Sequence, residues 1–246
     1  MTIAILSALP EEQAGWVQTL QGVHATRHAG RQFWQGRWQD ADTGAGHGVV
    51  CALSGIGKVA AATTAAALIE RFGVTRIVFT GVAGGMGAGV QVGDVVVASE
   101  YLQHDLDASP LFPRWELPGY GRTRLLCDPA MSAALYAASQ ACVGSAARAH
   151  HGLVVSGDQF VGTAKASQAL RAGLEAAGHA VLAVEMEGAA VAQTCYDYGV
   201  PFAAMRTISD RADDSASVDF ADFVRNVASR YAQQVLTGFL KRLPPA

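Results

Sequence analysis

The sequence predicts a three-layer α/β/α fold, in which helices cover both faces of a central mixed β-sheet. Three observations predict it. Apolar runs with little polar alternation, which are typical of strands buried on both faces, recur along the chain. Segments with helical patterning lie between most of these runs. Glycines or carboxylates directly follow the runs, at the strand ends where open α/β sheets place their ligands.

Length and composition indicate one soluble domain, residues 1–246. Half of the residues are hydrophobic and only 16% are charged, which excludes a disordered chain. The net charge of -3 gives no electrostatic reason to expect nucleic acid or an anionic membrane as a partner. Met1–Leu9 lacks the basic start of a signal peptide, and no apolar window is long enough to span a membrane. We therefore expect a cytoplasmic protein.

Cysteine and histidine spacing predicts no metal and no cofactor. The seven histidines form no helix-spaced pair. Gly55–Ala60 superficially matches a dinucleotide-binding fingerprint, but it does not follow the first strand, and the acid at Glu70 comes too early. A tight turn that lines another kind of pocket is the better interpretation. The four cysteines have neither metal-ligand nor C-x-x-C spacing, so reduced, packed thiols are expected at Cys51, Cys127, Cys142 and Cys195.

The N-terminal third is predicted to begin with a buried strand and a helix whose first turn contains Pro10. Glycine turns then separate three antiparallel strands. A long alanine-rich helix follows Ser54–Lys58, and Gly73 suits its C-terminal stop. The expected elements before that helix are Thr2–Ala8, Pro10–Leu20, Val23–His28, Gln32–Gln39 and Gly48–Leu53.

The remainder alternates strands with helices. A glycine-rich turn is expected over Gly81–Gly89. His104–Cys127 is the longest irregular stretch, and a loop this long and apolar is usually functional or covered by a partner. The other predicted elements are the strands Arg76–Thr80, Val92–Gln103, Gly152–Ser156, Val181–Val184 and Phe202–Ile208, and the helices Pro129–Val143, Ala164–Ala177, Glu185–Tyr198 and Asp219–Leu243.

Carboxylates at strand ends are the main candidates for chemistry. Glu12 follows the first strand, and Glu185, Glu187 and Asp210 follow the last two. The helix dipole favours an acid in a first turn without any further role, so each acid alone indicates a structural residue. Several such strand ends together would instead form one rim around one pocket. The ends that carry glycine or a carboxylate are Glu12, Ser54–Gly57, Val82–Gly84, Asp158–Phe160, Glu185–Glu187 and Ser209–Asp210.

The chain contains, in order, the motifs SGIGKV, TGVAGG, VGDVVV, VSGDQF, VEMEGAA and ISDRAD. With them it resembles the 5'-methylthioadenosine/S-adenosylhomocysteine nucleosidases of the nucleoside phosphorylase/hydrolase superfamily, over nearly its whole length. VEME and ISD are specific to the superfamily, and Glu12 points to the nucleosidase branch. The resemblance implies a homodimeric hydrolase without a cofactor. Such an enzyme cleaves the N-glycosidic bond of methylthioadenosine and/or S-adenosylhomocysteine, with 5'-deoxyadenosine as a further candidate, and releases adenine.

This chemistry suits the acids. Cleavage of the ribosyl–adenine bond builds positive charge on the sugar and negative charge on the base, the demand that gives glycosidases two carboxylates. By resemblance, Asp210 donates a proton toward adenine N7 and Glu12 activates the attacking water. Glu187 accepts both ribose hydroxyls, as an acceptor-only carboxylate can. A helix end lowers the pKa of Glu12 and burial raises it, and the sequence leaves open which effect prevails.

The resemblance also assigns the rest of the pocket. Met186 lies under the ribose with Glu185 near it. Phe160 stacks on adenine, beside a backbone contact from Val161. The apolar side chains that line the pocket for the 5'-substituent are Ile56 and Phe220. The substrate-binding set is completed by Ala83, Gly84, Ser209 and Arg206, which orients other groups.

Two departures from the family leave the preferred 5'-substituent open. Val82 stands where the family often has serine, so a hydroxyl in the sugar region is lost. His104–Gly121 matches only loosely in its middle. In the family this region crosses a dimer interface and caps the partner's 5' pocket, for which the candidates here are Leu111, Phe112 and Pro118.

Three rival functions stay open at this level. A phosphorolytic enzyme of the same fold needs an arginine or a nest of donors for phosphate, whereas Glu12 would repel phosphate and Arg76 lies at the wrong end of its strand. A hydrolase for another 5'-modified nucleoside, such as futalosine or an adenosylated lipid precursor, is compatible with Val82 and the divergent loop. A non-catalytic binding relative is disfavoured because the key carboxylates are all present.

Overall fold

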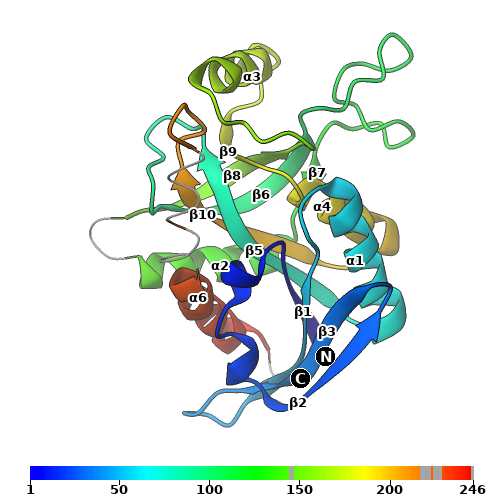
Figure 1. The fold of residues 1–246 in the computed structure, drawn as a ribbon, viewed down its shortest axis with the longest axis vertical. Coiled ribbons are helices and arrows are strands. Elements are labelled where there is room, and N and C mark those ends of the chain that lie inside the picture. Colours follow the sequence, from blue (N-terminus) through cyan, green and yellow to red (C-terminus); the bar gives the residue numbers. More distant parts are fainter. Residues whose placement is uncertain (144–146, 217–222, 224–228, 245–246) are drawn as a thin grey trace.

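The computed structural model describes residues 1–143, 147–216, 223 and 229–244, and its strands form one mixed sheet flanked by helices (Figure 1). The predicted α/β fold with a central mixed sheet is confirmed. The strands are β1 (Thr2–Ser7), β2 (Gln21–His28), β3 (Arg31–Gln39), β4 (Gly46–Leu53), β5 (Arg76–Gly85), β6 (Val95–Gln103), β7 (Leu125–Leu126), β8 (Ala149–Ser156), β9 (Val181–Glu185) and β10 (Phe202–Asp210). The helices are α1 (Lys58–Phe72), α2 (Pro129–Cys142), α3 (Ala164–Ala176), α4 (Gly188–Tyr198) and α6 (Ser229–Arg242), with two short 3-10 helices, η1 (Pro10–Gln13) and η2 (Val17–Thr19).

The long strand β5 organises the sheet. One of its edges pairs in parallel with β10, and the first half of the other edge pairs in parallel with β1. From β10 the sheet continues through β6, β8 and β9 and returns to β5, so five strands close on themselves. Gly84 of β5 pairs with Val184 of β9 on one side and with Asp210 of β10 on the other. Strand ends that are far apart in sequence therefore meet around Gly84.

Side chains of the central strands alternate between two hydrophobic clusters, one under each helix layer. In β1, Ala4 and Leu6 join the cluster under α1 and α4, whereas Ile3 and Ile5 join the cluster under α2 and α6. The two helix pairs lie on opposite sides of β5 in Figure 1. A strand buried on both faces needs apolar residues at every position, which explains the uninterrupted apolar runs.

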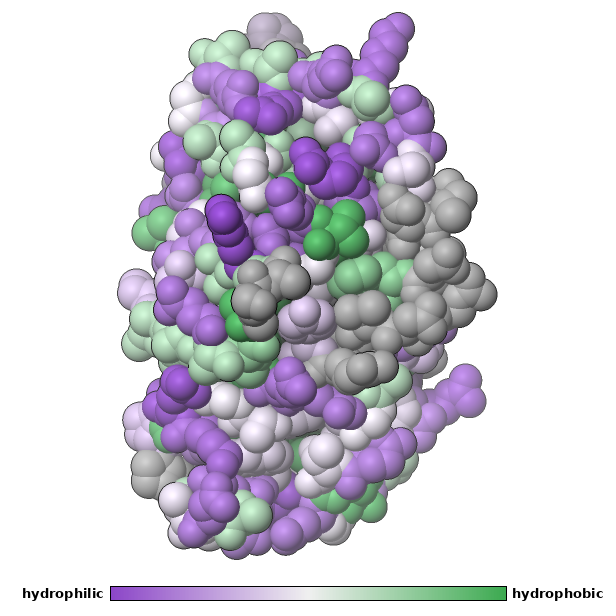
Figure 2. All heavy atoms as spheres, turned by 90° about the vertical axis from the view of Figure 1, so that its left-hand side faces the viewer, coloured by the Kyte–Doolittle hydropathy of each residue, from purple (hydrophilic) through white to green (hydrophobic). Residues whose placement is uncertain are grey.

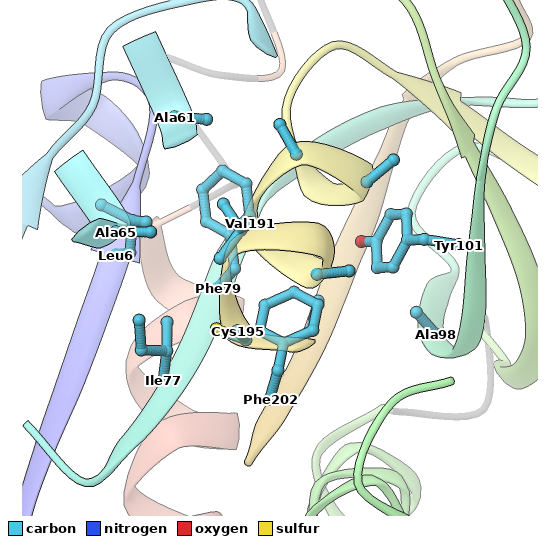
Figure 3. Close-up of a cluster of buried hydrophobic side chains, with 14 of the residues drawn as sticks. Leu6, Ala61, Ala65, Ile77, Phe79, Ala98, Tyr101, Val191, Cys195 and Phe202 are labelled. Carbon is cyan, nitrogen blue, oxygen red and sulfur yellow. The ribbon is translucent and has the colours of Figure 1, made fainter. Parts of the chain in front are cut away.

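Helix α4 lies close to its neighbours because its inward face consists of small residues. Figure 3 shows it between Tyr101 of β6 on one side and Ala61 and Ala65 of α1 on the other. Its first residue, Gly188, lies against the Tyr101 ring, and a Cβ built there would overlap the ring atoms. Only glycine fits at this start of the helix without moving the aromatic side chain.

Two sequence-based assignments are wrong in kind, whereas other boundaries within the described residues shift by at most three residues, as at the starts of β6, β8 and α4. The predicted helix Pro10–Leu20 is instead a pair of 3-10 helices, because Gly15 between them has a φ of 77° and interrupts the helical backbone. The predicted turn Gly81–Gly89 is strand as far as Gly85, since this backbone pairs with β9 and β10. Pairing with distant strands overrides the local turn preference of glycine.

The segment His104–Cys127 is largely irregular, as predicted, with β7 and one bridge between Leu117 and Arg122. Leu117 is buried within its own chain, whereas Leu111 is 84% exposed. At the end of the chain, α6 provides the described part of the predicted last helix. It buries Val235, Phe239 and Leu240.

The surface is of mixed polarity. On the face in Figure 2, hydrophobic residues form small separate patches among polar ones. None of the described helices combines the length and the hydrophobicity that a membrane span needs. The four cysteines are unpaired, and three of them are buried, namely Cys51, Cys127 and Cys195.

We expect Gly188→Ala to destabilise the fold by about 1–3 kcal/mol, because the added methyl group overpacks the core at Tyr101. Gly173→Ala in α3 is the matched control. Nothing lies within 4 Å of its Cβ position, and alanine is the better helix former. Urea denaturation of both variants measures the difference, and equal stability of the two would contradict the packing argument.

Candidate active site

The strand ends enclose a pocket of about 300 Å³, a size suited to a small molecule. Two predicted site residues are not in its lining: Arg206 is buried behind it, and Phe220 lies outside the described residues. The structure brings the other eleven together, namely Glu12, Ile56, Ala83, Gly84, Phe160, Val161, Glu185, Met186, Glu187, Ser209 and Asp210.

Five further residues line the pocket that the sequence analysis did not assign as substrate-binding, although two of them, Val82 and Gln159, belong to strand ends that it placed on the rim. Each is within a few positions of a predicted residue at the same strand end, and that proximity is the signal that would find them. These residues are Ala8, Leu9, Val82, Gln159 and Val184.

Glu12 is buried in η1, shortly after β1, and is held by three backbone N–H groups. Its Oε2 accepts from the N–H groups of Ala8 and Leu9, both at 2.8 Å, and its Oε1 accepts from that of Val82 at 3.0 Å. Burial raises the pKa of Glu12, and neither the charge of Arg206 nor the three N–H groups fully offset this effect. Burial therefore prevails over the helix end, which the sequence left open.

Arg206 lies beneath the acids with 1% of its surface exposed. Its guanidinium donates to Glu185 Oε2, lies 4.0 Å from Glu187 Oε2 and stacks 4.0 Å above the centre of the Phe79 ring. Gly81 leaves room for it, because a Cβ at that position would overlap the guanidinium. Burial opposes a charge on Arg206, but the neighbouring acids, Glu185 foremost, raise its pKa. Arg206 is therefore a permanent positive charge under the pocket.

Glu185 lines the pocket, yet its oxygens are already engaged. Its Oε1 accepts from the Ser156 hydroxyl and, at 3.0 Å, from the Gly188 N–H. Its Oε2 accepts from Arg206 and from the N–H groups of Glu187 at 3.1 Å and Gly188 at 2.9 Å. These bonds fill the acceptor capacity of a carboxylate, which is about four lone-pair sites. Glu185 thus satisfies the start of α4 and holds Arg206.

Glu187 is 6% exposed, and its Oε1 accepts from the Gly57 N–H at 2.9 Å. Burial, and then the charge of Glu185, raise the pKa of Glu187 to about 8 against the opposing effects of Arg206 and Gly57. At neutral pH the group therefore keeps its proton much of the time. The ionised form expected from the sequence needs additional donors to stabilise it.

Asp210 is 2% exposed at the end of β10. Its Oδ2 accepts from the Ser209 hydroxyl at 2.8 Å, and its Oδ1 accepts from the Ala212 N–H at 2.8 Å. A Cβ at the paired residue Gly84 would stand 2.9 Å from Oδ1. Glycine at that position therefore lets the carboxylate lie against the backbone of β5.

Two large apolar side chains stand at the mouth of the pocket. Ile56, just before α1, is 56% exposed, and Phe160, after β8, is 52% exposed. The Phe160 ring lies over Gly162, where a Cβ would meet it at 2.8 Å. Exposed apolar side chains at the mouth of a pocket provide a surface for a flat, apolar ligand.

The lining is acidic. Of the described residues that line the pocket, four are acids and none is basic. The nearby cation Arg206 is already engaged by Glu185. Across the described part of the chain, no group of three or more His, Cys, Asp or Glu side chains is placed to hold a metal ion. A pocket of this charge disfavours anionic ligands.

The raised pKa of Glu187 predicts that stability falls as the pH rises. The unfolded residue ionises near 4.5, whereas the folded residue keeps its proton up to about 8. Between these values the folded state binds more protons, so the free energy of unfolding decreases with pH through this window. We expect Glu187→Gln to reduce the decline in melting temperature from about pH 4.5 to 8. Glu175→Gln, on the exposed face of α3, is the control and should leave the decline unchanged.

An equal decline of melting temperature with pH in the parent and in Glu187→Gln would contradict this assignment of the pH dependence. Glu12 also has a raised pKa, so part of the decline should remain in the variant.

Comparison with known proteins agrees with this geometry. The model of the phosphorylase superfamily matches residues 2–241. A 5'-methylthioadenosine/S-adenosylhomocysteine nucleosidase of Shewanella denitrificans is 34% identical over 241 residues, which cover 96% of this chain and 97% of the relative.

Solved structures agree as well. The nucleosidase of Neisseria meningitidis in complex with methylthio-immucillin-A has a TM-score of 0.88 and 33% identity, over 98% of this chain and 99% of its own. That of Colwellia psychrerythraea in complex with adenine has a TM-score of 0.89 and 34% identity, over 99% of this chain and 96% of its own. The chain therefore belongs to the 5'-methylthioadenosine/S-adenosylhomocysteine nucleosidase family of the phosphorylase superfamily.

Proposed function

We propose that Glu12 and Asp210 are the base and the acid of an N-glycosidic hydrolysis. In it, the chain cleaves 5'-methylthioadenosine and/or S-adenosylhomocysteine to adenine and the 5-substituted ribose. The observation that carries the proposal is the convergence of Glu12, Glu187 and Asp210, three buried acids, on one pocket of about 300 Å³. The family names the substrates, and the geometry supports the roles.

Glu12 suits the activation of water. A general base works best when its pKa lies near the operating pH, and burial raises the pKa of Glu12 in that direction. The N–H groups of Ala8, Leu9 and Val82 hold its carboxylate in one orientation. Proton transfer from water therefore needs little reorganisation of the base.

Glu187 suits the binding of the ribose hydroxyls. Two sugar hydroxyls that donate to its carboxylate would favour the ionised form and lower its pKa from about 8. The ionised group would then stabilise the positive charge that grows on the sugar as the glycosidic bond breaks. Met186 beside it in the lining offers the sugar an apolar surface. We assign Glu185 to the support of Arg206 and α4, because its hydrogen bonds use up its acceptors.

Asp210 suits the protonation of adenine. Negative charge gathers on adenine as it departs, and a carboxyl group that donates to N7 neutralises it. The Ser209 hydroxyl at 2.8 Å can either donate to or accept from the neighbouring Asp210 oxygen, so it accommodates both protonation states. Phe160 in the lining provides the aromatic surface on which adenine can stack, and Val161 next to it is placed for a backbone contact with the base.

Phosphorolysis is the second candidate, since the matching family model is that of the phosphorylase superfamily. A phosphate dianion would have to approach a lining that holds four acids and no basic residue. Water, which is neutral, meets no such repulsion.

We also infer a homodimer, with the segment of residues 104–127 near the interface, and a cytoplasmic location. Val59, Leu111 and Leu126 are each at least 73% exposed, and apolar surface of this kind is commonly covered by a partner. The four unpaired cysteines suit a reducing compartment.

Glu12→Gln and Asp210→Asn should each lower turnover by about 10²–10⁴-fold, the usual contribution of a general acid or base. Both changes are nearly isosteric, so the fold should survive, as circular dichroism can verify. Adenine release from saturating methylthioadenosine is the measurement. Glu11→Gln, an exposed neighbour on η1, is the matched control and should keep parental turnover. Near-parental turnover in Glu12→Gln or Asp210→Asn would reject that residue's role.

A nucleoside panel assayed with and without phosphate tests the reaction and the substrate. We expect adenine from methylthioadenosine and/or S-adenosylhomocysteine at a rate that phosphate leaves unchanged, because the acidic lining repels the dianion. 5'-Deoxyadenosine and futalosine complete the panel. Adenine release that depends on phosphate would favour phosphorolysis, and preferential cleavage of futalosine would favour the other class of hydrolase.

A further inference from the structure

A ring of hydrogen bonds joins three segments at the pocket mouth. We call its members, Lys58, Asp105 and Asp158, the rim clasp. The Lys58 N–H donates to Asp158 Oδ1 at 2.8 Å, and the Asp158 N–H donates to Asp105 Oδ2 at 2.9 Å. The Lys58 ammonium closes the ring by donating to Asp105 Oδ1 at 2.6 Å. The rim clasp thus links the start of α1, the segment after β6 and the segment after β8.

The rim clasp is partly shielded from water. The side chains of Lys58 and Asp105 are 17% and 23% exposed, and the ammonium also donates to Gln103 Oε1 at 3.1 Å. Burial opposes ionisation of Asp105, yet the hydrogen bonds from Lys58 and from the Asp158 N–H lower its pKa. An ion pair with these additional donors is less screened than a pair on the open surface.

The backbone at Gly57 is adapted to the rim clasp. Gly57 has a φ of 99°, and a Cβ there would stand 3.2 Å from Asp158 Oδ1. Its N–H donates to Glu187 Oε1 at 2.9 Å. The residue next to Lys58 therefore holds one of the buried acids of the pocket.

The rim clasp also lies close in sequence to both side chains of the mouth. Ile56 precedes Lys58 by two residues, and Phe160 follows Asp158 by two residues. Ile56 and Phe160 line the pocket, whereas none of the three rim-clasp residues does. Any effect of the rim clasp on a bound molecule must therefore be indirect, and Ile56 and Phe160 are the lining residues nearest to it in sequence that stand at the mouth.

We propose that the rim clasp is a positioning device that holds Ile56 and Phe160 at the separation a nucleoside needs, without touching the nucleoside. The inference rests on the proposed function, in which Phe160 faces adenine, and on the family resemblance, which places Ile56 at the 5'-substituent. They contact the ligand in the ground state and in the transition state alike. Loss of the rim clasp therefore weakens the binding of the ground state and of the transition state to a similar extent. This raises KM and leaves kcat nearly unchanged.

The test is Lys58→Met, which removes the ammonium and keeps the length of the side chain. We expect KM for methylthioadenosine to rise about tenfold, as for one lost hydrogen bond, with kcat within about threefold of the parent. The Kd for adenine, measured by calorimetry without turnover, should rise by a similar factor. Adding Asp105→Asn to Lys58→Met should produce less further change than Asp105→Asn alone, because the two residues act as one unit.

Arg171→Met is the matched control. It breaks the exposed Arg171–Glu175 pair on α3, and it should change neither KM nor the Kd for adenine. A Lys58→Met variant with parental KM and Kd would overturn the proposal. So would a variant in which kcat and melting temperature fall while KM stays the same, since this result indicates a structural role alone.

The variants Glu12→Gln and Asp210→Asn distinguish this inference from the proposed function, because they should lower kcat with little change in KM. Parental turnover in these two variants would reject the catalytic roles. The Kd of Lys58→Met for adenine would still test the rim clasp in that case, because it is measured without turnover. Loss of turnover in them, together with an unchanged KM and Kd in Lys58→Met, would reject the rim clasp alone.

Discussion

The site depends on one buried positive charge among several negative ones. Arg206 contacts Glu185, lies 4.0 Å from Glu187 and lowers the pKa of Glu12. Without it, these buried carboxylates would keep their N–H donors but lose their compensating cation, a strongly destabilising change. One cation cannot neutralise all the acids, so burial still raises the pKa values of Glu12 and Glu187. The same imbalance leaves the site with carboxyl groups of raised pKa, which is common in active sites.

Close backbone approach makes this concentration of charge possible. Gly81 leaves space for Arg206 and Glu12, and Gly84 leaves space for Asp210. Both glycines belong to β5, where closure of five strands brings the ends of β9 and β10 to either side of Gly84. The chemical groups therefore lie on or directly beside strands of a closed sheet, which position side chains more accurately than free loops do.

The interior and the mouth of the pocket differ in physical character. The interior carries buried acids held by backbone N–H groups, whose orientation is set before any ligand arrives. The mouth carries the half-exposed Ile56 and Phe160 on segments that the rim clasp ties together. In the proposed mechanism, groups in the interior act on charge that develops during the reaction, whereas groups at the mouth act on affinity. Kinetic constants can separate the two.

The sequence by itself determined the order of most strands and helices, because apolar runs and glycine or proline stops are local signals. It also made Glu12, Glu187 and Asp210 candidates, because each lies at or shortly after the end of a strand and matches a motif of the family. Only the tertiary structure decided that Gly81–Gly85 is strand and that hydrogen bonds within the protein occupy the acceptor sites of the Glu185 carboxylate. It also decided that burial is the main influence on the pKa of Glu12. These properties arise from pairing and desolvation by residues distant in the chain. Pattern and spacing describe neighbours in sequence, and burial is a property of neighbours in space.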